Sequence, residues 1–156
     1  MAYKKSCVGI IQENPIVGDR AGNLELAKNA ISKLSKESSP DIFLLTEMFI
    51  TGYPPEDLIL REDLLDQAYE AVHELSKFRP ENFVVIGYTK KEEDSIFNCA
   101  GVLRNNSIIT EYKNKELPND EAFDEKRYLQ PGNGRGSYAE KGYRGGVTGC
   151  EDIWDK

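Results

Sequence analysis

The sequence predicts an α/β fold, and two observations carry that prediction. Amphipathic helical segments alternate with short apolar segments in the order strand, helix, strand, helix, strand. The apolar segments at residues 42–45 and 83–87 are continuous, which is typical of strands in a sheet covered by helices. With 156 residues the chain is expected to form one domain, and no linker or internal repeat divides it.

Helices are predicted where apolar residues recur every three or four positions, at residues 19–38 and 61–78. Pro40 follows the first of these helices, and the prolines at 54 and 55 place a loop between the two. The predicted strands are residues 5–12, 42–45, 83–87, 96–103 and 107–112, of which the last two form a hairpin. Beyond residue 118 the chain is polar and rich in glycine, and we expect a mobile loop at 132–136.

Composition excludes several classes of protein. The net charge of −7, from 20 basic and 27 acidic residues, argues against binding to nucleic acid or to an anionic membrane. No apolar segment approaches the roughly 20 residues of a membrane-spanning helix, and the N-terminus has no signal sequence, so we expect a cytoplasmic protein. Three cysteines without a Cys-x-x-Cys pair and a single histidine make a disulfide framework or a zinc site unexpected. That histidine, His73, is interpreted as a partly exposed residue of the second helix.

Two residues are candidates for chemistry. Glu47 follows the buried strand at 42–45, where partial desolvation would suit a general base; the alternative is a solvated loop acid. Cys150 follows a glycine-containing strand and could be a thiolate nucleophile; the alternative is a buried, inert thiol. A charged segment at 117–128 is by itself only a polar loop.

Taken together, these segments resemble the nitrilase superfamily of carbon–nitrogen hydrolases. Within it they are most similar to the N-terminal glutamine amidase domains of glutamine-dependent NAD⁺ synthetases, over the first half of such a domain, from about Ser6 to the last residue. The strings that carry the resemblance are Thr46-Glu47-Met48, Thr51-Gly52-Tyr53-Pro54-Pro55-Glu56-Asp57-Leu58, Asn98, Leu117-Pro118-Asn119, Phe123-Asp124-Glu125-Lys126-Arg127-Tyr128 and Cys150-Glu151-Asp152-Ile153-Trp154.

The resemblance implies a four-layer α-β-β-α sandwich with a Glu-Lys-Cys triad that hydrolyses the side-chain amide of glutamine and supplies ammonia for NAD⁺ synthesis. It places the general base at Glu47 and the nucleophile at Cys150, and it gives Glu151 a role in holding the substrate amino group. A Glu/Lys pair supplies the proton acceptor and positive charge that a thiolate needs, so no metal or organic cofactor is implied for this step.

This sequence departs from the family pattern at the lysine. The family's lysine lies three residues before the leucine of Leu-Pro-Asn, and here that position is Asn114. Lys113 and Lys115 flank it but should point to the opposite face of an extended segment. The loss of one oxyanion donor costs about 10²–10³ in rate, so we expect impaired hydrolysis.

Other departures weaken the pattern further. Asp120 replaces an aromatic residue of the family's pocket and would repel a substrate carboxylate. The chain ends at Lys156, so we expect an incomplete sandwich with no synthetase domain. Such a sheet would expose an apolar face, which self-association or another chain would cover.

Two alternative functions remain at this point. One is a catalytically inactive relative that keeps the fold and acts in assembly or regulation, or has no function; Asn114 and Asp120 favour it. The other is a nitrilase-type amidase for a different small substrate, completed by another polypeptide.

Overall fold

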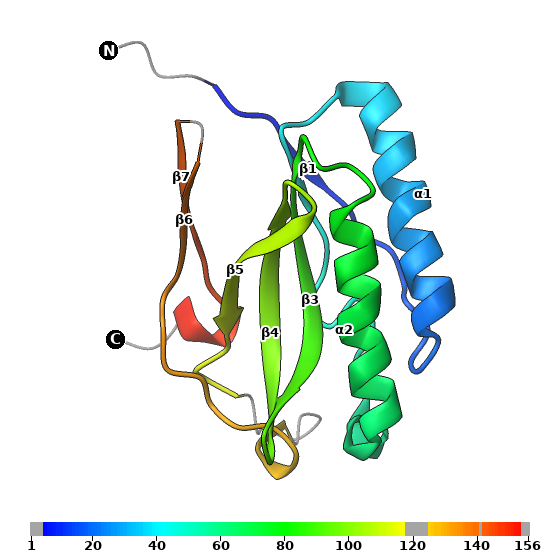
Figure 1. The fold of residues 1–156 in the computed structure, drawn as a ribbon, viewed down its shortest axis with the longest axis vertical. Helices are drawn as coiled ribbons and strands as arrows, with labels where there is room; N and C mark the ends of the chain where they lie inside the picture. Colours follow the sequence, from blue (N-terminus) through cyan, green and yellow to red (C-terminus); the bar gives the residue numbers. More distant parts are fainter. Residues whose placement is uncertain (1–4, 118–124, 141, 154–156) are drawn as a thin grey trace.

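A computed structural model describes residues 5–117, 125–140 and 142–153, and confirms the α/β fold (Figure 1). Five strands form one mixed sheet in the order β1-β2-β3-β4-β5, and two further strands form a separate hairpin. The strands are β1 (Val8–Ile10), β2 (Ile42–Leu44), β3 (Phe83–Glu92), β4 (Ser95–Arg104), β5 (Ser107–Lys113), β6 (Gly136–Glu140) and β7 (Tyr143–Val147). The helices are α1 (Arg20–Ser38) and α2 (Glu62–Ser76), with short 3₁₀ turns η1 (Glu56–Leu60), η2 (Glu125–Arg127) and η3 (Glu151–Ile153).

The first three strands are parallel because a helix crosses over between each pair, whereas β3, β4 and β5 are antiparallel. Helix α1 begins where the side chain of Asp19 accepts a hydrogen bond from the backbone N–H of Gly22 at 3.0 Å. The helix ends before Pro40, as predicted, with Ser39 in the left-handed conformation at its C-cap.

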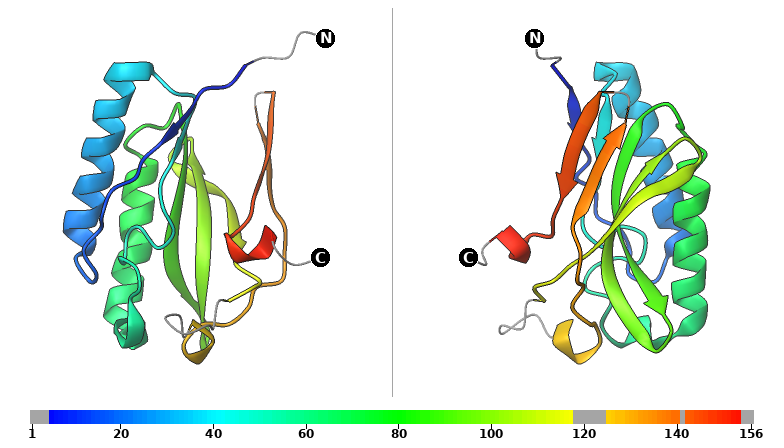
Figure 2. Two further views of the ribbon diagram at one scale, coloured as in Figure 1. Left: turned by 180° about the vertical axis from the view of Figure 1, so that it is seen from behind. Right: turned by 60° about the vertical axis from the view of Figure 1, so that its left-hand side comes forward.

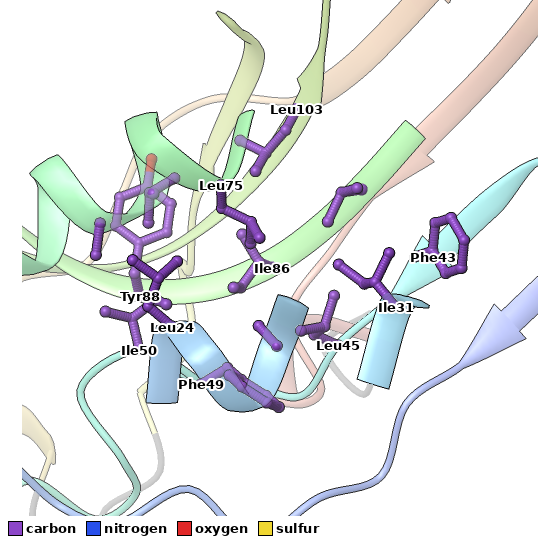
Figure 3. Packing of buried hydrophobic residues seen from close by; sticks show 14 of the residues in the cluster. Leu24, Ile31, Phe43, Leu45, Phe49, Ile50, Leu75, Ile86, Tyr88 and Leu103 are labelled. Atoms are coloured by element: carbon purple, nitrogen blue, oxygen red, sulfur yellow. The ribbon is translucent and has the colours of Figure 1, made fainter. Parts of the chain in front are cut away.

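Both helices cover the same face of the sheet and pack side by side (Figures 1 and 2). The core between them and the sheet is apolar and includes the fully buried Ile31, Phe43 and Ile86 (Figure 3). His73 lies half-buried on α2 with its ring edge-on to Tyr69, 4.7 Å between ring centroids, in agreement with its interpretation as a helix residue.

The opposite face of the sheet is only partly covered, by the β6–β7 hairpin (Figures 1 and 2). Tyr138 and Val147 of the hairpin pack near Phe83 of β3, with 5.1 Å between the rings of Tyr138 and Phe83. Towards the β1 edge the described residues leave this face open, and Ile10 and Leu44 are 65% and 38% exposed.

Several sequence expectations need correction. The segment at 42–45 is not buried on both faces, because nothing in the described residues covers Leu44 on the side away from the helices. The first strand is shorter than predicted, β1 comprising Val8–Ile10 only, and β3 runs on past Gly87 to Glu92. At the end of the expected loop at 132–136, Gly136 begins β6 and pairs with Val147.

Self-association through the open face is expected to depend on Ile10. The Ile10→Asp variant should raise the dissociation constant of a dimer about tenfold or more, because burial of one isoleucine contributes about 1.5–3 kcal/mol. Sedimentation equilibrium over a range of protein concentrations measures this constant. Leu60→Asp is the matched control, since Leu60 of η1 is 58% exposed but lies outside the sheet. A native chain that stays monomeric throughout the range contradicts self-association.

Candidate active site

Glu47 lies in a turn that follows β2, and backbone hydrogen bonds hold this turn in place. The backbone N–H of Leu45 donates to Val85 O at 2.9 Å, which continues the pairing with β3 beyond the end of β2. Met48 then adopts a positive φ of 45°, and its carbonyl accepts from the N–H of Gly52 at 2.8 Å. A non-glycine residue in the left-handed region is uncommon and persists only where the surroundings hold it.

Gly87 of β3 allows this turn to approach the sheet. A Cβ at position 87 would lie 2.4 Å from Met48 N and 2.6 Å from Glu47 Cα, closer than any real contact. The backbone N–H of Gly87 also donates to Thr46 O at 3.3 Å. The glycine is therefore required by the position of Glu47.

The Gly87→Ala variant is expected to displace the Glu47 turn and to destabilise the fold by about 1–3 kcal/mol, the usual cost of overpacking a tight site. Urea unfolding measures the change. Gly146→Ala is the control, because its added Cβ would meet only one atom, Gly136 O at 3.8 Å. Equal losses of stability in the two variants contradict a specific role for Gly87.

The Glu47 carboxylate is held by two asparagine amides. Asn98 Nδ2 of β4 donates to Glu47 Oε1 at 2.7 Å, and Asn114 Nδ2 donates to the same oxygen at 3.0 Å. The two asparagines are only 1% and 6% exposed. Glu47 itself is exposed, so the expected partial desolvation of its side chain is wrong.

Asn114 occupies the position that the family pattern gives to lysine, and its backbone is anchored on both sides. Its N–H donates to Asn98 O at 2.9 Å, and its carbonyl accepts from Gly132 N at 2.8 Å. Lys113 turns away, pairs with Glu92 and lies 4.4 Å from the ring centre of Phe97. The prediction that Lys113 faces away from position 114 is confirmed.

Cys150 is brought to this group by the residue before it. A Cβ on Gly149 would lie 2.7 Å from Asn114 Cγ, so the backbone that leads into Cys150 packs directly against the Asn114 amide. Cys150 is exposed and free, which contradicts the alternative of a buried thiol; Cys99 is the buried cysteine. The structure thus brings together Glu47, Asn114 and the turn that carries Cys150.

The turn is tied down by Asp152, which accepts hydrogen bonds from Gly149 N at 3.1 Å and from Tyr112 Oη at 2.6 Å. Burial opposes ionisation of Asp152, but hydrogen bonds from Tyr112 and from the backbone of Glu116, Gly149 and Lys115 outweigh it and hold its pKa below the usual range.

Two predicted site residues cannot be placed. Asp120 falls outside the described residues, and for Glu151 only the backbone is described, in η3.

The sequence assigned no role to Tyr53, Asn98 or Glu125. Tyr53 Oη donates to Glu125 Oε1 at 2.9 Å, a contact between segments far apart in the chain.

Two hollows adjoin the site and share Tyr53. A shallow one of about 240 Å³ includes Thr46 and Glu47, and a more enclosed one of about 290 Å³ includes Tyr53 and Glu125 but not Glu47. Of these two hollows, the shallow one contains the Glu47 carboxylate. Within the described ranges no group of three His, Cys, Asp or Glu side chains could hold a metal ion. In the same ranges no helix has the length and apolar character to cross a membrane.

Comparison with known proteins identifies the family to which the chain belongs. The carbon–nitrogen hydrolase family model matches residues 7–155. The glutamine-dependent NAD⁺ synthetase of Thermotoga maritima is 34% identical over 155 residues, which are 97% of this chain and 26% of that protein. The corresponding protein of Acinetobacter baylyi is 30% identical over 94% of this chain. This chain thus spans about a quarter of the length of these relatives.

Solved structures give the same answer for the fold. Glutamine-dependent NAD⁺ synthetase from Acinetobacter baumannii superposes with a TM-score of 0.86 at 30% identity, over 96% of this chain and 28% of that one. An amidase from Nesterenkonia sp. superposes with a TM-score of 0.81 at 18% identity, over 97% of this chain and 58% of that one, and so supports the nitrilase-like fold alone. On the family match and the fold, the chain belongs to the carbon–nitrogen hydrolase family.

Proposed function

We propose that this chain is part of a glutamine amidase domain of the kind found in glutamine-dependent NAD⁺ synthetases, and that its turnover is impaired. The single observation that carries the proposal is the contact between Glu47 and Asn114 beside the Cys150 turn, with 3.0 Å between Asn114 Nδ2 and Glu47 Oε1. A carboxylate, an amide donor and an exposed thiol at one place are the groups that thioester chemistry uses. The relatives named above are glutamine-dependent enzymes, which supports glutamine as the substrate.

In the proposed reaction Glu47 takes the thiol proton of Cys150, and the sulfur attacks the side-chain amide carbon of glutamine. The C–N bond breaks, and ammonia leaves with the proton from Glu47. Water then gives a proton to Glu47 and attacks the thioester, which releases glutamate, and the thiol of Cys150 regains its proton. These steps use side chains and water alone, so no cofactor is required.

By resemblance, the Glu151 carboxylate would pair with the substrate amino group, while Asp120 would repel the substrate carboxylate. Asn114 can donate a hydrogen bond to the tetrahedral oxyanion but adds no positive charge. Position 114 therefore supplies no cation that would favour the ionised form of the Cys150 thiol. The proposed impairment follows from this neutral amide and from Asp120.

A diazo-ketone analogue of glutamine tests the proposal, because a glutamine pocket beside a thiol would make that thiol the preferred site of alkylation. Peptide mass spectrometry should find the label on Cys150 and not on the exposed Cys7 or the buried Cys99. Excess glutamine should slow the labelling, and Cys150→Ser should abolish it. Equal labelling of Cys7 and Cys150 contradicts a specific pocket.

The second candidate is a catalytically inactive relative that acts through its surface. The neutral Asn114 in contact with Glu47 favours it, and so does the open apolar face with Ile10 at 65% exposure. In that case iodoacetamide would alkylate Cys150 while the diazo-ketone analogue would not.

A further inference from the structure

We propose that Asp152 is the positioning residue of this site: it fixes the Cys150 turn against the segment that carries Asn114. The inference rests on the proposed function for its chemical meaning, because it concerns where the nucleophile is held. The contacts on which it depends belong to the fold and can be measured without any reaction.

The carboxylate of Asp152 joins two segments that are distant in sequence. Its Oδ1 accepts from the backbone N–H groups of Lys115 at 3.0 Å and Glu116 at 2.6 Å. Its Oδ2 accepts from Tyr112 Oη at 2.6 Å and from the backbone N–H of Gly149 at 3.1 Å. Each oxygen therefore has two donors. Both donors to Oδ1 come from the segment that follows β5, whereas Oδ2 has one donor from β5 and one from the Cys150 turn.

These four contacts surround the catalytic candidates without including them. Lys115 directly follows Asn114, and Gly149 directly precedes Cys150. The backbone at Gly149 lies so close to the Asn114 amide that a Cβ there would come within 2.7 Å of it. A small movement of the turn would thus change the separation between the thiol and the Asn114–Glu47 pair.

Only a carboxylate satisfies this arrangement. An asparagine at 152 has one acceptor oxygen, so its NH₂ group would face either the two backbone N–H groups or the Tyr112 hydroxyl and Gly149 N–H. An NH₂ group cannot accept from a backbone N–H, so either the N–H groups of Lys115 and Glu116 or that of Gly149 would lose their acceptor. Because Asp152 is half-buried, loss of these hydrogen bonds should loosen the Cys150 turn.

The same donors keep Asp152 ionised. They hold its pKa below the ordinary value although burial acts in the opposite direction. In the folded chain the carboxylate charge is therefore present above the ordinary aspartate pKa and is lost only as the pH falls through the lowered one. The titratable group that donates to it is the Tyr112 hydroxyl; burial and the contact with Asp152 raise the pKa of Tyr112 to about 12, so Tyr112 stays protonated around neutral pH.

The test compares Asp152→Asn with Asp94→Asn, the same chemical change at an exposed residue of the β3–β4 turn. Hydrogen exchange should show the N–H of Gly149, Lys115 and Glu116 exchanging about tenfold faster or more in Asp152→Asn only, as expected for loss of a charge-assisted hydrogen bond. Amides in the middle of β3 and β4 should keep their native exchange rates, which separates a local effect from unfolding.

The chemical readout is the rate of Cys150 alkylation by two reagents. In Asp152→Asn the rate of reaction with the diazo-ketone analogue of glutamine should fall by a factor of about ten or more. Iodoacetamide should react at the native rate or faster. Tyr112→Phe keeps the carboxylate and three of its donors, so it should give an intermediate rate with the analogue. Asp152→Glu keeps the charge at the wrong length and should restore exchange protection only in part.

The outcomes separate the two proposals. If the native chain is not labelled by the analogue but Asp152→Asn still releases the three amides, the proposed function fails and the positioning role stands. If exchange at those amides is the same in Asp152→Asn and the native chain, Asp152 does not hold the turn. Equal slowing of both reagents would also overturn the inference, since it would indicate a change in access to the thiol rather than in its placement.

Discussion

The Asn114→Lys variant is expected to react with the diazo-ketone analogue of glutamine about 10²–10³-fold faster than the native chain, the effect usually attributed to one oxyanion donor. An ammonium at position 114 would face the Glu47 carboxylate, to which Asn114 Nδ2 now donates at 3.0 Å. It would add the positive charge that favours the Cys150 thiolate and strengthen the donor to the oxyanion. The backbone at position 114 is already held in place, because its N–H donates to Asn98 O and its carbonyl accepts from Gly132 N.

The measurement is the second-order rate constant for alkylation of Cys150 as a function of pH. The thiol of Asn114→Lys should titrate at lower pH than that of the native chain, so the gain should be largest below the ordinary thiol pKa of about 8.5 and shrink above it. Asn29→Lys, the same substitution on the exposed side of α1, is the control for net charge. A thermal midpoint close to the native one shows that the longer side chain fits beside Gly149.

An unchanged rate in Asn114→Lys, with Asn29→Lys also unchanged, would contradict the triad interpretation of this site. The neutral amide would then not be what limits the thiol. The inactive-relative interpretation would gain, because restoration of the missing charge would have restored nothing.

Much of the fold could be predicted because its signals are local. The Asp19 cap and the apolar spacing of residues 19–38 lie within one segment, and α1 begins and ends within a residue of its prediction. The β4–β5 hairpin follows from two apolar segments around a short polar turn.

The strand ends were missed because they are polar. The final residues of β3 include Lys90, which pairs with Glu111 of β5 at 2.7 Å and with Glu92 at 3.0 Å. The Lys90–Glu111 pair joins two strands and the Lys90–Glu92 pair lies within β3; charged pairs of this kind leave no apolar pattern in the sequence. The expectation that the 42–45 strand is buried on both faces failed for a similar reason, since an apolar run does not reveal whether both faces are covered.

The candidate site shows the same difference between residues that local sequence signals identify and residues that act through long-range contacts. Glu47, Asn114 and Cys150 were placed by the strings around them, and the structure brings their segments together. Asn98 and Asp152 act through contacts across the fold, from β4 to the Glu47 turn and from η3 to the segment after β5. A single sequence has no periodicity or spacing that reports such contacts, so they become visible only in the folded structure.

The Glu47→Gln change in the Asn114→Lys background is expected to remove most of the gained rate, a loss of about 10²–10⁴-fold for removal of a general base. Glutamine has the size of glutamate, and its amide oxygen can still accept from Asn98, so the position of the turn is retained while the proton acceptor is lost. In the native background the same change should have a smaller effect, because the neutral Asn114 supplies no positive charge for Glu47 to act with.

The four rates form a double-mutant cycle, and the coupling between positions 47 and 114 is its result. Glu13→Gln, at an exposed residue that lines the same hollow as Glu47, controls for the loss of one negative charge at this hollow. Additive effects would mean that Glu47 and the residue at 114 act on Cys150 independently, and the proton-transfer role of Glu47 would be wrong. A strong coupling would instead mean that Glu47, the charge at position 114 and the Cys150 thiol act together. This agrees with the structure, in which Glu47 and Asn114 are in contact and Asn114 packs against the turn that carries Cys150.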